Sequence, residues 1–373
     1  MLRFWTYTIM VITMLLTSFG VLIIAYAGKT QSPDVMRHFM MQAMFLGVAV
    51  VGAAVLYRLD YRWYLKPQLL WTLAGLAIFA LLLVITPGIG RKVNGSMRWL
   101  RLGPLSVQPV EFVKLMVILF LAAYYETIGG RVLRWKQGVI IPALVVGAIA
   151  GLLVVQPDFG GTMIVCFLAG VTMLLAGVGF WRCLLLGSCA AVIVGALVLT
   201  NENRVQRLMN EQKDENYQAK QSRIAFQNGG TYGVGLGKGM QKENYLPECH
   251  TDFIFAVIAE DFGLVATASI WSAFLLLLCG GSVIAFRAKD KQGMLLAFGS
   301  TMLICVQGVS NMAVATNVFP TKGLALPFLS YGGSCLLSSV FAVGVILGVG
   351  RKTIELETED AEQPRSQKVV SFD

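Results

Sequence analysis

Long apolar runs separated by polar stretches dominate this sequence. Ten runs are close to or above the roughly 20 residues that an α-helix needs to cross a bilayer. They cover residues 7–27, 40–57, 69–86, 112–128, 138–155, 161–178, 181–200, 262–286, 293–318 and 323–349. The first third of the last run is interrupted by Pro327 and by Gly332-Gly333. The pattern predicts an all-α polytopic membrane protein with about ten transmembrane helices.

The first apolar run also has to be weighed as a cleavable signal peptide. The residues "AYAG" at 25–28 have the small-x-small look of a cleavage site. The apolar region before them is longer than the roughly 7–15 residues typical of a signal. We therefore expect a retained membrane anchor.

Polar residues gather in two connecting segments and at the C-terminal end. Residues 201–252 form the one long loop, and residues 87–111 form a second loop. The long loop begins with charged and spaced apolar residues, which is typical of a surface amphipathic helix, and then becomes rich in glycine. We expect a membrane domain over residues 1–352 and a disordered tail over residues 353–373.

The distribution of Lys and Arg predicts the orientation. With the N-terminus inside, the inner short loops hold thirteen of these residues and the outer short loops hold seven. Inner loops of membrane proteins are the richer in positive charge, so both termini are predicted to face the cytoplasm and the long loop to face outward. The net charge of +9 reflects this bias and anionic lipid, and is no evidence for nucleic acid.

Composition excludes an ordinary soluble domain and gives no sign of a disulfide-stabilised or cysteine-metal protein. Only 14% of the residues are charged and 56% are hydrophobic, whereas an ordinary soluble domain carries about 25% charge. Six of the seven Cys lie in or beside apolar runs, and Cys249 lies alone in the long loop. The sequence has no disulfide framework and no CxxC metal pattern.

Ionisable residues inside the apolar runs are functional candidates, because a charge at mid-bilayer costs at least about 2.5–3.5 kcal/mol. Glu111 and Lys114 are three residues apart at the start of one run, hence on one helical face. Asp158 interrupts two runs, and a third group of acids lies in "YLPECHTDFIFAVIAED" at residues 245–261. All three places lie toward the outer leaflet and can line one cavity. The alternative for each is a helix cap or a local ion pair.

Fixed cations accompany these acids. Arg98 and Arg101 flank Trp99, and Lys322 lies in a segment broken by Pro and Gly. Irregular backbone at membrane depth is tolerated only where it is buried or lines a water-filled cavity. Carboxylates and cations beside such a segment suit a lipid-linked phosphate with a reacting hydroxyl, but a proton-coupled transporter would use the same residue types.

Two other motifs carry little weight. The stretch "GVGLGKG" at 233–239 lacks the spacing of a phosphate-binding loop and follows no strand. Glu248, His250 and Asp252 alternate, so an extended chain would place them on one face, but no second cluster of zinc ligands is visible.

Four segments together resemble a known family. They are "NGSMRWLRLGPLSVQPVEFVKL", "QPDFGGT", "YLPECHTDFIFAVIAEDFGL" and "TKGLALPFLSYGGS". They look like the signature segments, in the same order, of the SEDS (shape, elongation, division and sporulation) proteins, and the similarity covers about residues 5–352. "QKENYLPE" and "TKGLALPFLSYGG" are more like the cell-division branch of the family than its rod-elongation branch. Met97, Cys249 and Cys335 depart from the usual pattern, without touching the matched charged positions.

The resemblance implies a ten-span peptidoglycan glycosyltransferase that polymerises lipid II at the outer face of the bacterial inner membrane, at the division septum. It assigns the catalytic acid to Asp252. Other positions associated with substrate binding in the family are Arg98, Glu111, Lys114, Asp158, Gln221, His250, Lys322 and Ser330. It also implies a class B penicillin-binding protein as a transpeptidase partner, together with other division proteins.

A sugar hydroxyl is a poor nucleophile at neutral pH, so the implied reaction needs a general base, for which Asp252 is the candidate. The leaving pyrophosphate needs countercharge from Arg98, Lys114 or Lys322, and a divalent Mg or Mn ion is a further candidate because hard cations suit oxygen ligands. No organic cofactor is expected. Two alternatives remain open: a lipid II flippase or transporter, and a non-catalytic division scaffold.

Overall fold

The computed structural model describes residues 1–27, 35–64, 66–93, 96–103, 105–199, 217–241, 245–319 and 323–362. Eight helical spans in these ranges are long and apolar enough to cross a membrane. The helices that form them are α1 (Leu2–Ala27), α2 (Val35–Arg58), α4 (Pro67–Ile85), α5 (Pro109–Ile128), α6 (Ile141–Val155), α10 (Ile254–Arg287), α11 (Lys291–Ala315) and α12 (Gly333–Glu362). Two further apolar helices are α7 (Phe159–Leu175) and α8 (Phe180–Leu199). These helices match the ten apolar runs and confirm the all-α polytopic fold.

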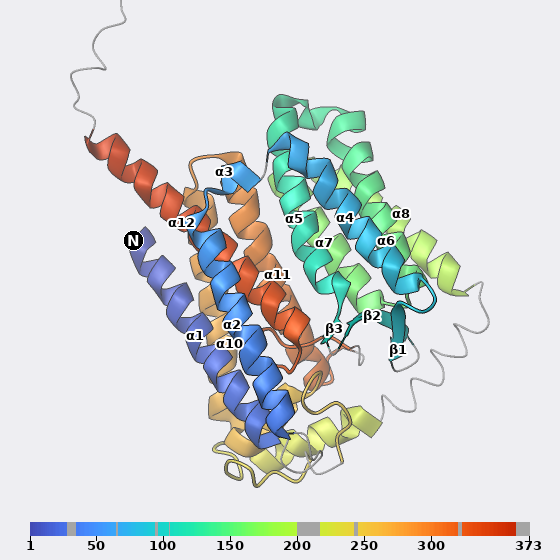
Figure 1. Cartoon of the computed structure of the whole chain (residues 1–373), viewed down its shortest axis with the longest axis vertical. Coiled ribbons are helices and arrows are strands. Elements are labelled where there is room, and N and C mark those ends of the chain that lie inside the picture. Colours follow the sequence, from blue (N-terminus) through green and yellow to red (C-terminus); the bar gives the residue numbers. More distant parts are fainter. Residues whose placement is uncertain are drawn as a thin grey trace, which may run out of the picture.

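The helices form two groups that meet along α5, α11 and α12. Figure 1 shows α1, α2, α10, α11 and α12 on one side and α4 to α8 on the other. Helix α5 packs against both α11 and α12, and α7 also reaches α11. The N-terminal residue and the end of α12 lie toward the same end of the bundle (Figure 1). That is the arrangement expected of an even number of spans.

Helices α2 and α12 approach each other unusually closely because glycines line their contact. A Cβ built on Gly344 would lie 2.8 Å from the Cα of Ala53, and one on Gly348 would lie 2.9 Å from the carbonyl oxygen of Leu56. The two glycines are four residues apart, which is the small-xxx-small spacing that lets membrane helices pack through their backbones. Close backbone packing therefore holds α12 in place, and α12 in turn borders the site described below.

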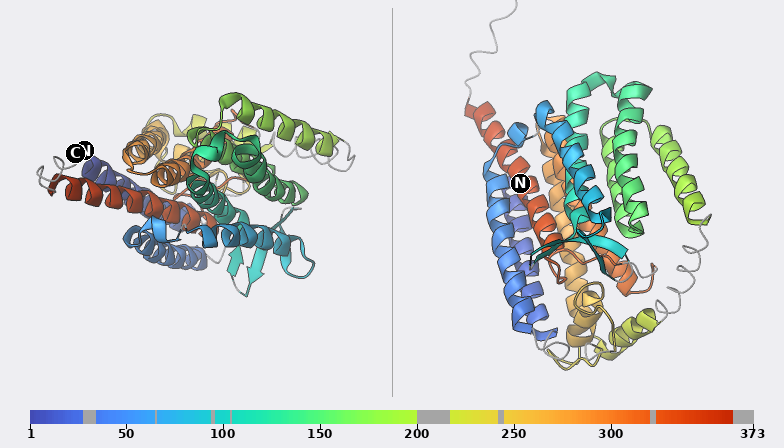
Figure 2. Two further views of the ribbon diagram at one scale, coloured as in Figure 1. Left: turned by 90° about the horizontal axis from the view of Figure 1, so that it is seen from above. Right: turned by 45° about the vertical axis from the view of Figure 1, so that its right-hand side comes forward.

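The second loop predicted from the sequence contains a small sheet that the hydrophobic pattern did not reveal. Strands β1 (Gly90–Val93), β2 (Ser96–Leu102) and β3 (Leu105–Val107) pair antiparallel in that order. Leu100 of β2 faces Gly90 on one side and Val107 on the other. The sheet contacts α4 and α5 and lies at one end of these helices (Figure 2, right). It carries Arg98 on its central strand.

The remaining helical turns are short. They are α3 (Tyr61–Tyr64), a 3₁₀ turn over Gly129–Leu133 and a π turn over Trp135–Ile140 that leads into α6.

In the long loop, residues 217–229 are helical, within the region where an amphipathic helix was expected, and the earlier residues 200–216 lie outside the described ranges.

The glycine-rich part of the long loop is held on the start of α10 by two buried acids. Glu260 accepts hydrogen bonds from the backbone N–H groups of Met240 at 3.1 Å and Gln241 at 3.0 Å. Asp261 accepts one from the N–H of Gly239 at 3.0 Å. These two carboxylates therefore replace water as partners of loop N–H groups, and their charge serves structure here.

A glycine allows the loop to approach α10. Gly263 has φ 74° and interrupts the helical geometry of α10. A side chain there would lie 2.4 Å from the backbone nitrogen of Gly233. The kink leaves the N–H of Leu264 free to bond to the carbonyl of Gly230 at 2.9 Å.

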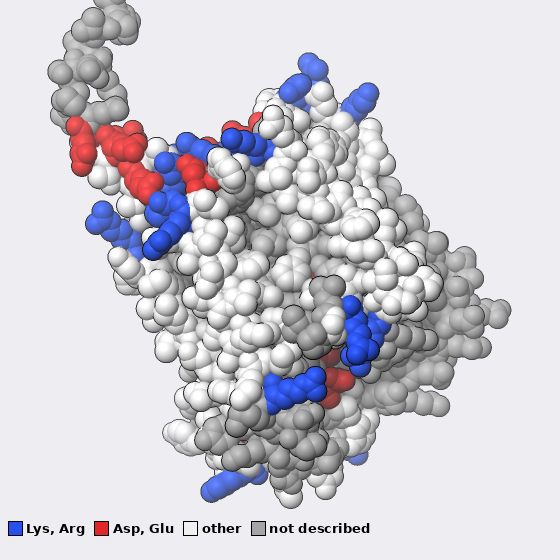
Figure 3. Space-filling view, viewed as in Figure 1, with Lys and Arg blue, Asp and Glu red and all other residues white. Residues whose placement is uncertain are grey.

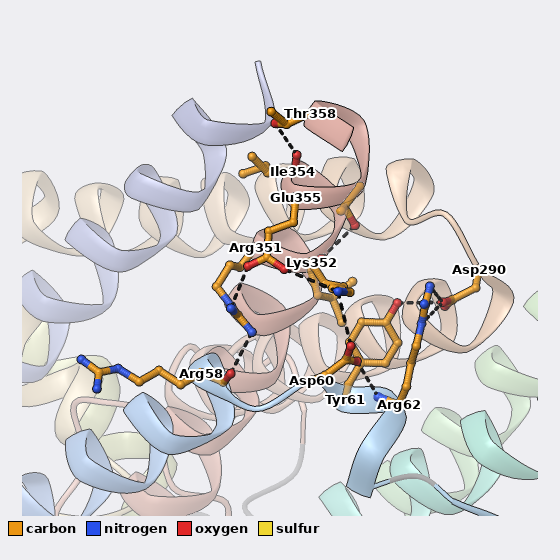
Figure 4. Close-up of polar contacts among 12 residues, drawn as sticks. Arg58, Asp60, Tyr61, Arg62, Asp290, Arg351, Lys352, Ile354, Glu355 and Thr358 are labelled. Carbon is orange, nitrogen blue, oxygen red and sulfur yellow. Dashed lines mark hydrogen bonds and ion pairs between the residues drawn. The ribbon is translucent and has the colours of Figure 1, made fainter. Parts of the chain in front are cut away.

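The C-terminal segment differs from the sequence prediction. Helix α12 continues to Glu362, so residues 353–362 are helical where a disordered tail was expected, and residues 363–373 lie outside the described part. Figure 4 shows the contacts that hold this extension. Arg351 pairs with Glu355 at 2.7 Å, and Lys352 lies 3.6 Å from Asp60. These ion pairs connect the extension to itself one helical turn on and to the turn between α2 and α3, while Thr353 and Ile354 pack toward the core.

Charged side chains gather in two places on the face drawn in Figure 3. Figure 3 shows Lys, Arg, Asp and Glu gathered at the end where α12 projects, and a smaller mixed group on the opposite half of the same face. The surface between them is largely uncharged (Figure 3). This band is the surface expected to face lipid.

The close contact of α2 and α12 makes a specific prediction. Gly344→Val should lower stability by about 1–3 kcal/mol, because the added side chain forces the two backbones apart. Gly147→Val on α6 is the matched control, since no atom lies within 4 Å of a Cβ built there. Thermal unfolding of both purified variants in detergent measures the difference. Equal melting temperatures for the two variants would contradict the packing argument.

Candidate active site

A short loop before α10 carries the predicted catalytic acid. Residues 245–253 form turns in which the N–H of Asp252 bonds to the carbonyl of Glu248 at 3.1 Å. Leu246, Cys249 and Phe253 are buried and fix the loop to the bundle. Asp252 itself stays partly exposed. The loop is thus anchored by its apolar residues and presents its carboxylate at the edge of the membrane domain.

Two other segments meet this carboxylate. Arg98 comes from β2, and its charge acts on Asp252. Gly323 comes from the segment before α12, where a Cβ would lie 3.2 Å from Oδ2 of Asp252 and 3.9 Å from Nη1 of Arg98. Residues far apart in the sequence therefore converge on Asp252, and the absence of a side chain at Gly323 leaves the carboxylate room.

Asp158 supports Arg98 from the start of α7. Its carboxylate accepts a hydrogen bond from the N–H of Gly161 at 3.0 Å and so caps α7. The same carboxylate lies 3.9 Å from Nη1 of Arg98, whose Nη2 donates to the carbonyl of Pro157. Asp158 is only 4% exposed. The structure thus confirms that Asp158 is a helix cap, and its role as a site residue stays a prediction.

The surroundings of Asp252 change its acidity. Burial among protein atoms raises the pKa of its carboxyl, the negative charge of Glu248 raises it further, and Arg98 lowers it, with a result of about 7. A carboxyl with a pKa near 7 can accept a proton from a substrate and still release it at neutral pH. This combination of a positioned carboxylate and a perturbed pKa is typical of a catalytic group.

Glu111 and Lys114 form a separate buried cluster inside the bundle. Nζ of Lys114 lies 2.8 Å from Oε1 of Glu111 and 2.6 Å from Oε1 of Gln307 on α11. Lys114 is only 1% exposed. Gln307 also donates to the carbonyl of Ala325, 3.2 Å away, which links the cluster to the segment that follows Gly323. This hydrogen bond to the carbonyl of Ala325 is the link between the cluster and the segment beside Asp252. Among the described contacts, neither Glu111 nor Lys114 touches Asp252 itself.

Ser330 contacts the loop that carries Asp252. Its hydroxyl donates to the carbonyl of Thr251 at 2.6 Å and accepts from the N–H of Leu326 at 2.7 Å. It is 3% exposed, so its hydroxyl is engaged with backbone. Its carbonyl accepts a hydrogen bond from Gln42 of α2 at 3.3 Å. Ser330 therefore supports the loop that carries Asp252.

His250 belongs to the same loop as Asp252. Its carbonyl accepts from the N–H of Tyr331 at 2.9 Å, and the Tyr331 ring contacts the ring of His38 at 4.9 Å. Burial, and the second histidine His38, lower the pKa of His250. His250 is half-buried.

Gln221 and Lys322 are the last two residues predicted from the sequence, and the structure describes only the first of them. Gln221 lies in the helical residues 217–229, which dock on the end of α11 through a hydrogen bond from Ser222 to the carbonyl of Ala315 at 2.5 Å. Lys322 lies outside the described residues.

The described residues of the site do not form a set of side-chain ligands for a permanently bound metal ion. In the described ranges, no three His, Cys, Asp or Glu residues gather where they could hold a metal ion. The residues of the site therefore do not fit a metal held by the protein alone.

Two amide side chains were missed by sequence reasoning, which considered only ionisable groups in the apolar runs. Gln307 and Asn311 lie one turn apart on α11 and are almost fully buried. The signal was present in the sequence, because an amide inside an apolar span also needs hydrogen-bond partners.

Comparisons with known proteins agree with this architecture. The family model of the FtsW, RodA and SpoVE proteins, described as cell cycle protein, matches residues 6–355. A protein of Trichlorobacter lovleyi named probable peptidoglycan glycosyltransferase FtsW is 38% identical over 361 residues, which are 93% of this chain and 94% of the relative. A protein of the same name from Coxiella burnetii is 36% identical over 365 residues, or 94% and 97% of the two chains.

Solved structures share the fold as well. The rod shape determining protein RodA of Thermus thermophilus is 27% identical with a TM-score of 0.69, and the match covers 92% of this chain and 96% of RodA. A chain from a peptidoglycan synthase complex that coordinates polymerization and crosslinking has a TM-score of 0.75 at 27% identity, covering 93% and 98% of the two chains. The signature segments, the family model and these relatives agree, and the chain belongs to the SEDS family of FtsW, RodA and SpoVE proteins.

Proposed function

We propose that this chain polymerises lipid II into glycan strands at the outer face of the bacterial cytoplasmic membrane, in the wall synthesis of cell division. Relatives at 34–39% identity bear the name probable peptidoglycan glycosyltransferase FtsW. The observation that carries the chemistry is the carboxylate of Asp252, which faces Arg98 across a segment without a side chain at Gly323. This geometry supplies a base and a countercharge side by side.

Asp252 is the proposed general base. The 4-hydroxyl of one lipid II sugar attacks the anomeric carbon of the growing chain, and its proton passes to a carboxylate oxygen of Asp252. The new glycosidic bond forms as the bond to the pyrophosphate oxygen breaks, so undecaprenyl pyrophosphate leaves with the electron pair. A positioned base contributes typically about 10²–10⁴-fold to such a step.

Arg98 is the proposed partner of the leaving pyrophosphate. Negative charge grows on the leaving oxygen as the sugar bond breaks, and a fixed guanidinium stabilises that charge. Asp158 and the carbonyl of Pro157 hold Arg98 in place and also compete for its charge. Lys322 is proposed as a second cation for the same group.

The other candidates are proposed to shape the site. Lys114 and Glu111 neutralise each other inside the bundle, and Ser330 bonds to backbone on both sides. His250 and Gln221 remain proposed contacts of the substrate. A divalent Mg or Mn ion is proposed to arrive only with the pyrophosphate, and no step of the reaction is assigned to it.

A class B penicillin-binding protein is the proposed partner that cross-links the new glycan, and the septum is the proposed location. The support is the fold shared with a chain of a synthase complex that couples polymerization and crosslinking. A partner that activates the enzyme must bind its active arrangement more tightly than its idle one.

The first test removes the base. Asp252→Asn should lower polymerisation of lipid II by the purified protein at least about 100-fold, because the amide keeps the shape of the side chain but cannot take the proton. Asp360→Asn on the projecting end of α12 is the matched control and should retain normal activity. Glycan products on a gel provide the measurement, and an unchanged melting temperature shows that the variant is folded.

Near-normal product from Asp252→Asn would eliminate the role of this residue. Absence of polymer from the unaltered protein, with and without a co-purified transpeptidase, would favour the transporter or the scaffold.

The second test measures how kcat/KM depends on pH. Because only the deprotonated Asp252 can act as base and its pKa is about 7, kcat/KM should rise with pH through this value. Glu248→Gln removes a charge that raises this pKa, so the rise should move to lower pH. Arg98→Gln removes a charge that lowers it, so the rise should move to higher pH. Shifts of both profiles in the same direction would contradict this electrostatic account.

A further inference from the structure

Asn311 occupies an unusual position on α11. It lies one turn beyond Gln307, is 1% exposed, and belongs to a helix that is otherwise apolar enough to cross the membrane. A buried amide without hydrogen bonds is costly, so such a residue needs partners within the protein. Its partners are two backbone carbonyls from different parts of the chain.

The Nδ2 atom of Asn311 donates to the carbonyl of Asp252 at 2.8 Å and to the carbonyl of Leu324 at 2.6 Å. Carbonyls only accept hydrogen bonds, so the amide nitrogen must face both of them. Each of the two amide protons then has one acceptor. The orientation of the side chain is therefore determined by its surroundings.

Both carbonyls belong to the residues that enclose the carboxylate. Asp252 carries it, and Leu324 follows Gly323, where a Cβ would lie 3.2 Å from Oδ2 of Asp252. One side chain thus ties the loop that holds the acid to the segment that forms the opposite wall. Ser330 fixes the neighbouring carbonyl of Thr251, but its second bond goes to Leu326, deeper in the same segment.

We propose that Asn311 is a positioning residue that holds the catalytic loop and the Gly323–Leu324 segment at a fixed separation around Asp252. The inference rests on the proposed role of Asp252 as base. Asn311 touches neither substrate nor the reacting atoms; it acts through the two backbones.

Loss of this amide has a defined physical consequence. Two carbonyls lose their donor, and the two segments can separate to bond to water. Water that enters beside Asp252 weakens the effect of burial, which is the largest cause of its raised pKa. Two described charges act on the carboxylate of Asp252, namely Glu248 from the same loop and Arg98 from β2. Arg98 in turn lies near Asp158 at the start of α7. None of these charges changes in an Asn311 variant.

The experiment compares Asn311→Ala with Leu303→Ala. Leu303 is a buried core residue of the same helix, and truncating it creates a cavity that lowers stability without deleting a polar contact. Asn311→Ala should lower kcat at least about 10-fold and move the rise of kcat/KM to lower pH. Leu303→Ala should keep the pH profile of the unaltered protein even if its melting temperature falls further.

Amide hydrogen exchange provides a readout that does not depend on activity. In Asn311→Ala, peptides covering residues 245–253 and 323–330 should both exchange at least about 10-fold faster, whereas peptides from α5 should not change. Unchanged exchange in these peptides, or a pH profile that Leu303→Ala shifts equally, would overturn the proposal. Failure of Asp252→Asn to abolish activity would instead overturn the role of Asp252, and the exchange result would stand by itself.

Discussion

Within the apolar interior of this bundle, a polar side chain that lacks a hydrogen-bond partner in the protein is costly, because lipid offers none. Lys114 has such partners in Glu111 and Gln307, and Gln156 donates to the carbonyl of Leu81 at 2.8 Å. Since such partners lie on different helices, satisfying them also fixes how the helices pack. The two helix groups are joined where α5, α11 and α12 share these bonds.

The same requirement explains where the candidate site lies. Close to the outer end of the bundle the chain leaves helical geometry, and its carbonyls and N–H groups must be bonded by side chains or by loop backbone. Ser330 and Asn311 bond to adjacent carbonyls of the loop that carries Asp252. The backbone of this loop is thus bonded to side chains from other parts of the chain, while the side chain of Asp252 stays partly exposed.

The helices were predictable because each is a long apolar run. Glu111, Lys114 and Asp158 were singled out because a charge in or beside such a run requires an explanation. Gln221, His250 and Ser330 followed only from the family resemblance, and the roles of all these residues stay predictions. The small sheet was not predictable, since strands of three to seven residues in a polar loop leave no periodic signal. The sequence also did not show that the acids near residue 250 have different contacts. Glu260, Asp261 and Asp252 are alike in the sequence, and only their contacts show that the first two bind loop N–H groups while the third faces Arg98.

Helix α12 runs from the candidate site to the far end of the molecule without a break. Near its first turn, Ser334 accepts from the N–H of Gln108 at 2.9 Å and Ser338 donates to the carbonyl of Glu111 at 2.7 Å. Its last turns carry Lys352 and Asp360 beyond the other end of the bundle. Thirty helical residues span about 45 Å. One continuous helix therefore connects the residues that border the candidate site with the ion pairs at the opposite end of the bundle.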